Sequence, residues 1–258
     1  MSGQVLWVKE GAVARVSLTR PARMNAMTRD MWRQLSDVFG SINQDATLKL
    51  VVVSGSQRHF CAGGDISEYP AFRFDQASLR DFHEKDVWGG LRAVLSCPVP
   101  VIAVIQGNCM GAGLEIASCC DIRLASETAR FGAPIAKLGF PMAPRELQLV
   151  ASRLGASIAT DLLLGAQIYE APRLLASGYL HASVPESALV ESVERRIGQM
   201  LTLSPQAARL NKRGIQALME PNDESMCIWV EKAYDYASSA EHREGVTAFL
   251  EKRLPSFD

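Results

Sequence analysis

The chain has 258 residues, a net charge of −1 and 48% hydrophobic residues, which is typical of a globular protein built around one large domain. Its near-neutral charge excludes a general attraction to nucleic acid or to an anionic membrane. The central apolar run from Val99 to Ile105 contains a proline and is too short to cross a bilayer. The first residues lack the charged start and apolar stretch of a signal peptide, so we expect a cytoplasmic protein.

The predicted elements begin with a hairpin, in which alternating apolar residues at 5–8 and 13–18 flank a turn at Glu10-Gly11. A proline-led loop follows at 20–26, and Thr28 is a predicted cap for a helix with apolar residues at helical spacing. A buried strand at 50–53 comes next. A long helix or helix pair is then predicted over about 75–95.

The second half begins with a buried strand at 101–105, a glycine turn and a helix near 112–119. Short strands are predicted at 121–125 and 129–132, and the pattern from about 145 onward is helical. Strand, small-residue turn and helix therefore recur, which predicts an α/β core over residues 1–200. Residues 201–258 show no strand signals and are predicted to form a helical extension.

Two small-residue turns carry the predicted chemistry, Cys61-Ala62-Gly63-Gly64-Asp65-Ile66 and Gly107 to Glu115. Glycine and alanine let the backbone approach a ligand closely, and a helix N-terminus adds partial positive charge. Two such turns can supply two N–H donors to one oxyanion. Glu115 lies beside the second turn, where burial near apolar neighbours is expected to raise its pKa for acid–base work.

Each of these features has a structural alternative. The turns can serve strand–helix packing without a ligand, and Glu115 can be a helix-start glutamate favoured by the helix dipole. Asp65 is expected to cap a helix. A dinucleotide site is disfavoured because the glycines of the second turn do not follow the G-x-G-x-x-G spacing.

The six cysteines match neither zinc spacing nor a disulfide framework, so we expect small buried thiols in a reducing compartment. The four histidines show no mutual spacing that indicates a metal site. The sequence therefore predicts no metal.

Five segments in order resemble the enoyl-CoA hydratase/isomerase (crotonase) family from end to end. They are Leu18–Pro21 with Asn25–Met27, Phe60–Ile66, Gln106–Glu115 with Ala117 and Cys120–Ala125, Phe131–Pro134 with Leu138–Pro141, and Glu244–Arg253. The resemblance implies a spiral of ββα units, a C-terminal helical trimerisation region and a homo-trimer or homo-hexamer. It implies an acyl-CoA thioester as the substrate, with CoA as part of that substrate and no separate cofactor.

The resemblance also implies roles for individual residues. The N–H groups of Gly64 and Ala112 match those that hold the thioester oxygen, and Glu115 matches one of two catalytic glutamates. The remaining residues expected to contact the substrate are Ala62, Asp65, Ile66 and Ile135, Arg23 and Met24 along the CoA path, and Phe249 and Lys252 at the CoA adenine and phosphates.

One departure from the family pattern concerns the second glutamate, which follows the proline of the third motif in hydratases. Here Pro134 is followed by Ile135, and an apolar residue cannot orient water or transfer a proton. Glu146 can replace the missing acid, although a solvated helix face is the expectation for it.

Hydration of an unusual enoyl-CoA, double-bond isomerisation, decarboxylation of a malonyl-type thioester and thioester hydrolysis all stay open. A non-catalytic CoA-binding or assembly protein is the rival from another class.

Overall fold

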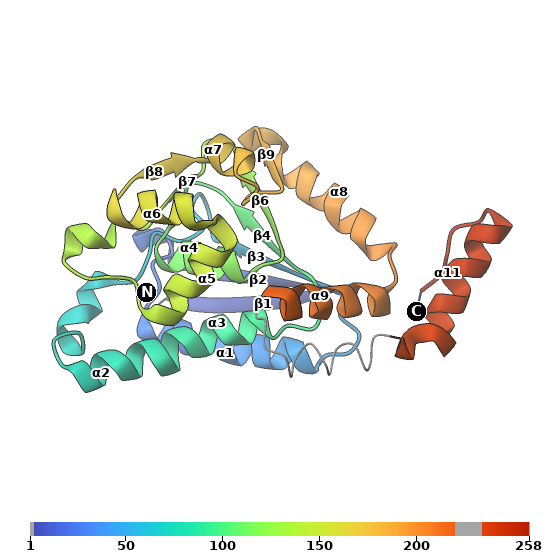
Figure 1. Ribbon diagram of the computed structural model, residues 1–258, viewed down its shortest axis with the longest axis horizontal. Helices are drawn as coiled ribbons and strands as arrows, with labels where there is room; N and C mark the ends of the chain where they lie inside the picture. Colours follow the sequence, from blue (N-terminus) through green and yellow to red (C-terminus); the bar gives the residue numbers. More distant parts are fainter. Residues whose placement is uncertain (1–2, 220–233, 258) are drawn as a thin grey trace.

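The computed structural model describes residues 3–219 and 234–257, and within these ranges the strands form two sheets. The larger sheet has six strands in the order β1-β2-β3-β4-β6-β9 (Figure 1). Their bounds are β1 Gln4–Glu10, β2 Val13–Thr19, β3 Leu50–Gly55, β4 Val101–Ile105, β6 Ile122–Ser126 and β9 Ala182–Val184. The smaller sheet has the order β5-β7-β8, with bounds Asn108–Met110, Arg130–Gly132 and Ile168–Glu170.

The predicted hairpin is confirmed, because β1 pairs antiparallel with β2 and Val8 lies opposite Arg15. Within the larger sheet β2, β3, β4, β6 and β9 run parallel to one another, with Val16 opposite Val53 and Val53 opposite Ala103. Parallel strands need crossover connections, and the helices of the chain supply them. The larger sheet is therefore an α/β sheet with one antiparallel edge strand, as its sequence pattern predicts.

Apolar residues cover both faces of this sheet, because alternate side chains of one strand point to opposite sides. Val51 and Val53 join the main core with residues of α1 (Arg29–Gln44) and α3 (Trp88–Leu95). Leu50 and Val52 join a second core against α8 (Leu189–Leu201). Continuous apolar strands such as 50–53 are thus buried on two sides, which explains why they show no polar alternation.

The other helices pack around this sheet or extend from it (Figure 1). Thr28 caps α1 by accepting a hydrogen bond from Met31 N–H at 3.1 Å, as predicted. The expected helix pair at 75–95 is α2 (Gln76–Asp81), a π-helical turn η3 (Phe82–Val87) and α3. The remaining helices and turns are η1 Pro21–Arg23, η2 Ile66–Ala71, α4 Ala112–Cys119, η4 Pro134–Leu138, α5 Pro144–Leu154, α6 Ala156–Leu164, α7 Ala171–Ala176, η5 Glu186–Ala188, α9 Pro205–Met219, η6 Asp235–Ser238 and α11 Ala240–Glu251.

Two strands contradict the expectation of an all-helical chain after residue 145. These are β8 and β9, which pair with β7 and β6. The short strand β5 lies within the segment that was expected to be only a glycine turn. Each of these strands has three residues, which is too short for a period-2 pattern to distinguish it from a loop.

The C-terminal helix α11 lies at one end of the molecule, away from the larger sheet (Figure 1). Glu241 at its start accepts a hydrogen bond from Ser204, and Lys49 donates one to the carbonyl of Phe257 at 2.5 Å. No helix in the described part of the chain is long and apolar enough to cross a membrane. Cys61, Cys97, Cys109, Cys119 and Cys120 are buried free thiols as predicted, whereas Cys227 lies outside the described residues.

Gly113→Ala tests how closely α4 approaches the first turn. An added Cβ at Gly113 would lie 2.6 Å from the Cys61 carbonyl oxygen, so the helix or the turn must shift. We expect a loss of about 1–3 kcal/mol in the free energy of unfolding, measured by urea denaturation. Gly40→Ala is the matched control, because nothing lies within 4 Å of its Cβ position in α1. That variant should gain about 0.5–1 kcal/mol; equal effects of the two changes would contradict this packing.

Candidate active site

A cavity of about 230 Å³ lies where the two small-residue turns meet. Gly64 of the first turn and Ala112 of the second both line it, and so do Glu115 and Ile135. The sequence-predicted centre of the site is therefore brought together in one place. A cavity lined by apolar groups and a few polar ones is the usual form of a small-molecule site.

Backbone hydrogen bonds hold the two turns side by side. Cys61 N–H donates to the Asn108 carbonyl at 2.9 Å, and Met110 N–H donates to the Cys61 carbonyl at 2.9 Å. This parallel bridge joins the first turn to β5, directly before α4. A second bridge ties the first turn to the preceding loop, through Met27 N–H and the Gly63 carbonyl. The relative position of the two turns is thus fixed by main chain on both sides.

The N–H groups of Gly64 and Ala112 have no protein acceptor among the described residues. Both residues line the cavity, and Ala112 is the first residue of α4, whose opening N–H groups have no partner within the helix. Gly111 precedes it with φ 45°, a conformation that favours glycine. Two such donors and a helix N-terminus beside one cavity are the kind of arrangement that can hold a negatively charged oxygen.

Glu115 projects into the same cavity from the first turn of α4. Burial, together with a smaller effect of the nearby charge of Glu146, raises the pKa of its carboxyl group to about 8. At neutral pH Glu115 is therefore mostly protonated. This confirms the predicted direction of the shift and gives the cavity a neutral proton donor.

Glu146 corrects one expectation from the sequence. The residue lies on α5 and was expected on a solvated helix face, but it is only 2% exposed. Its Oε1 lies 3.0 Å from Nδ1 of His83. A buried carboxylate is costly without a partner, and the imidazole supplies that partner. Ile135, by contrast, lines the cavity with an apolar side chain, as its position in the third motif predicts.

His83 lies on η3 and lines the cavity that contains Glu115. Its Nε2 is 3.5 Å from Nη1 of Arg73, and the Arg73 guanidinium lies over the Phe140 ring, 3.5 Å from the ring centroid. Burial lowers the pKa of Arg73, and the neighbouring Tyr69 opposes that effect. Glu146, His83 and Arg73 therefore form a chain of polar contacts from the interior to the cavity wall.

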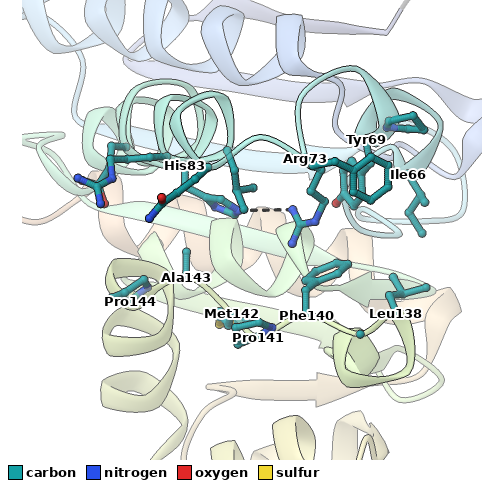
Figure 2. A pocket seen from close by; sticks show the side chains of 17 residues that line it. Ile66, Tyr69, Arg73, His83, Leu138, Phe140, Pro141, Met142, Ala143 and Pro144 are labelled. Atoms are coloured by element: carbon teal, nitrogen blue, oxygen red, sulfur yellow. Dashed lines mark hydrogen bonds between the residues drawn. The ribbon is translucent and has the colours of Figure 1, made fainter.

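A larger outer cavity of about 990 Å³ adjoins the inner one. Figure 2 shows its two facing walls, with Tyr69, Arg73 and His83 on one side and Phe140 and Met142 on the other. These five residues line both cavities, so the inner space continues into the outer one. The combined volume is large enough for an extended small-molecule chain.

The predicted substrate contacts near the first turn divide into two sets. Ala62 and Ile66 line the inner cavity. Asp65 does not; it caps η2, receives hydrogen bonds from Ser67 and forms a 2.6 Å ion pair with Arg20. Burial alone would raise the pKa of Asp65, but the hydrogen bonds from Ser67 and Arg20 outweigh it and lower that pKa. Its expected role as a helix cap is confirmed, and a substrate contact stays a prediction.

The residues predicted along CoA lie outside both cavities. Arg23 and Met24 are exposed in the loop after β2, which is held by the buried side chain of Asn25. Phe249 is 83% exposed on α11, and Lys252 is exposed at the end of that helix. Within one chain the structure does not bring this pair to the cavity, because α11 lies at the far end of the molecule (Figure 1).

Sequence reasoning missed Tyr69, Arg73 and His83, the polar residues of the cavity wall. Tyr69 lies in η2, Arg73 between η2 and α2, and His83 in η3, and no motif marks any of them. The hydroxyl of Tyr69 would lie 2.4 Å from a Cβ added at Gly64, so it packs directly against the first turn. Across residues 3–219 and 234–257, no group of three His, Cys, Asp or Glu side chains is arranged to hold a metal ion.

The sequence pattern of the family described as "Enoyl-CoA hydratase/isomerase" matches residues 8–258. The chain is 31% identical over 251 residues to the short-chain-enoyl-CoA hydratase of Clostridium acetobutylicum, covering 96% of this chain and 95% of that protein. It is 30% identical over 260 residues to the crotonyl-CoA hydratase of Syntrophomonas wolfei, covering 98% and 97%. The crystal structure of an enoyl-CoA hydratase/carnithine racemase from Magnetospirillum magneticum matches with a TM-score of 0.93 and 33% identity, covering 98% and 95%. These likenesses confirm the predicted crotonase-like α/β fold.

Glu115→Gln tests the buried carboxyl group through stability. Below pH 4.5 the folded and unfolded chains both keep the proton; between pH 4.5 and about 8 only the folded chain keeps it. The stability of the wild-type chain therefore falls across this window and levels off above it. Since glutamine does not titrate, the variant should gain roughly 2–4 kcal/mol relative to wild type over the same window.

Urea unfolding at both ends of that pH window measures this gain. Glu194→Gln, which removes an exposed carboxylate on α8, is the control and should show no such rise. A Glu115→Gln difference that does not change with pH would contradict the buried, protonated state of Glu115.

Proposed function

The chain belongs to the enoyl-CoA hydratase/isomerase family, and on that premise we propose that its inner cavity binds an acyl-CoA thioester and stabilises the enolate of that thioester. The names of the similar hydratases from Clostridium acetobutylicum and Syntrophomonas wolfei support an enoyl-CoA as the substrate class. The acyl chain extends into the outer cavity, between the wall of Tyr69 and the wall of Phe140.

The observation that carries the proposal is the pair of unpaired N–H groups at Gly64 and Ala112 beside a carboxyl group. A thioester oxygen that accepts hydrogen bonds from both groups polarises the carbonyl. The negative charge of the enolate is then carried on that oxygen. One donor of this kind typically contributes about 10²–10³ in rate. The N-terminus of α4 adds to this stabilisation.

Glu115 then moves a proton at the α-carbon. Its pKa of about 8 means that it holds the proton at neutral pH and can give it to the enolate carbon. In the reverse direction the carboxylate takes the proton back. The same group can therefore serve water addition or double-bond migration, and the nature of the second acid–base group decides between them.

Phe249 and Lys252 would contact the CoA half only from a neighbouring copy of the chain. Their exposure on α11 and the position of that helix at one end of the molecule, away from α4 (Figure 1), support such an arrangement. We therefore include a homo-trimer or homo-hexamer, assembled through the C-terminal helices, in the proposal.

Glu115→Gln should lower turnover of enoyl-CoA substrates by about 10²–10⁴, because the amide cannot supply a proton. Affinity for the acyl-CoA should stay close to wild type, since the donors of Gly64 and Ala112 are unchanged. Mass spectrometry of an acyl-CoA panel in deuterated water measures both the product and the exchange of the α-proton. Wild-type binding without exchange or turnover on any thioester would favour the non-catalytic rival. Unchanged kcat in Glu115→Gln would remove this residue from the mechanism.

Ala112→Pro tests the second donor directly, because proline lacks an N–H and is tolerated at the first position of a helix. We expect kcat/KM to fall by about 10²–10³ while the fold, followed by circular dichroism, is kept. Ala112→Gly retains the N–H and should stay close to wild type in rate. A folded proline variant with the wild-type rate would contradict the donor role of Ala112.

A further inference from the structure

We propose that His83 and Glu146 form the second acid–base element of this site and that His83 activates the water that adds to the β-carbon of an enoyl-CoA. The inference rests on the proposed function and makes it more specific, because it assigns hydration as the reaction. It places on η3 and α5 a role that Ile135 cannot perform.

The geometry joins the two residues across separate elements. His83 lines both the inner and the outer cavity, so its ring faces the space in which an acyl chain would lie (Figure 2). Glu146 lies behind it, 2% exposed, with Oε1 3.0 Å from Nδ1. Its oxygens are sequestered from water, so its influence on the reaction would pass through the imidazole.

The contacts of His83 determine which ring nitrogen carries the proton. The guanidinium of Arg73 can only donate, so Nε2 accepts at that 3.5 Å contact. The proton then lies on Nδ1, which donates to the Glu146 carboxylate. The lone pair of Nε2 therefore faces the Arg73 guanidinium at the cavity wall. The Arg73 contact is at the long limit of a hydrogen bond, and a water that donates to Nε2 can replace it.

The groups that face His83 suit a base. Glu146 from α5 stabilises the imidazolium that forms when the ring takes a proton, and Arg73 opposes it from the other side. The neighbouring ring of Phe82, 5.1 Å away between centroids, carries no charge. Glu84 and Arg145 form an exposed ion pair with each other on the same two segments. Glu115 holds a proton and would act as the acid, so the base and the acid of the reaction are different groups.

The reaction step balances without a further reactant. Nε2 of His83 takes a proton from water while the water oxygen bonds to the β-carbon. The electron pair of the carbon–carbon double bond shifts towards the thioester, and the charge collects on the oxygen held by Gly64 and Ala112. Glu115 then gives its proton to the α-carbon. The imidazolium loses its extra proton to solvent, the Glu115 carboxylate regains one from solvent, and one water has been added.

His83→Asn is the decisive variant, because the asparagine amide can still donate to Glu146 while Nε2 is removed. Hydration of the enoyl-CoA substrates should fall by about 10²–10⁴. Exchange of the α-proton of a saturated acyl-CoA in deuterated water should persist near the wild-type rate, since it depends on Glu115 and the two N–H donors. Arg145→Gln is the matched control: it breaks the exposed ion pair between the same segments and should leave both rates unchanged.

Glu146→Gln tests the positioning role. We expect kcat to fall by about 10-fold or more with little change in KM. The acidic limb of the kcat/KM profile should move to lower pH, because the anion that stabilises the imidazolium is gone. Glu146→Asp should recover part of the loss. A purely structural role would lower the amount of folded enzyme and leave the position of that limb unchanged.

Three outcomes would overturn the inference. Wild-type hydration rates in His83→Asn would exclude His83 from the mechanism, but the proposed enolate stabilisation would stand. A wild-type enzyme that exchanges the α-proton but hydrates no enoyl-CoA in the panel would do the same. A wild-type enzyme that neither exchanges the α-proton nor turns over any thioester would contradict the proposed function, and with it the role of His83 and Glu146.

Discussion

The site depends on one main-chain constraint, the parallel bridge between Cys61 and Cys109. The bridge fixes the first turn against β5, and β5 leads directly into α4, so the donors of Gly64 and Ala112 cannot move independently. Gly113 permits the contact, because any side chain there would meet the Cys61 carbonyl. Donors held in place before the reaction need no reorganisation when charge develops, which is the physical basis of oxyanion stabilisation.

Burial sets the chemistry of the two carboxyl groups beside this bridge. Glu115 has no cationic partner among its described contacts and is held in its neutral form, with the nearby Glu146 adding to that effect. Glu146 is buried more completely but has an imidazole against it. Two carboxyl groups in neighbouring but different environments can therefore take different roles. Among the described residues, Glu115 is the one carboxyl group that lines the inner cavity beside the apolar Ile135, and His83 adds an imidazole to the same lining.

Much of this arrangement could be predicted from the sequence. The strands at 50–53 and 101–105, the cap at Thr28 and the two turns have local signals, because each depends on a short apolar run or on glycine and capping chemistry. The three-residue strands β5, β8 and β9 have no such signal and form through pairing with distant strands. The burial of Glu146 could not be predicted, because it depends on α5 packing against η3, some sixty residues earlier in the chain. His83 and Arg73 were missed for the same reason.

The central claim is that two amides from separate turns polarise the carbonyl of a bound thioester, and vibrational spectroscopy tests it most directly. Difference infrared spectra of a carbonyl-¹³C-labelled acyl-CoA, bound to Glu115→Gln so that no turnover occurs, report the stretching frequency of that one bond. The account predicts a clear shift to lower frequency on binding, and a smaller shift when Ala112→Pro is added. A bound thioester whose carbonyl frequency equals that of the free substrate in water would contradict it.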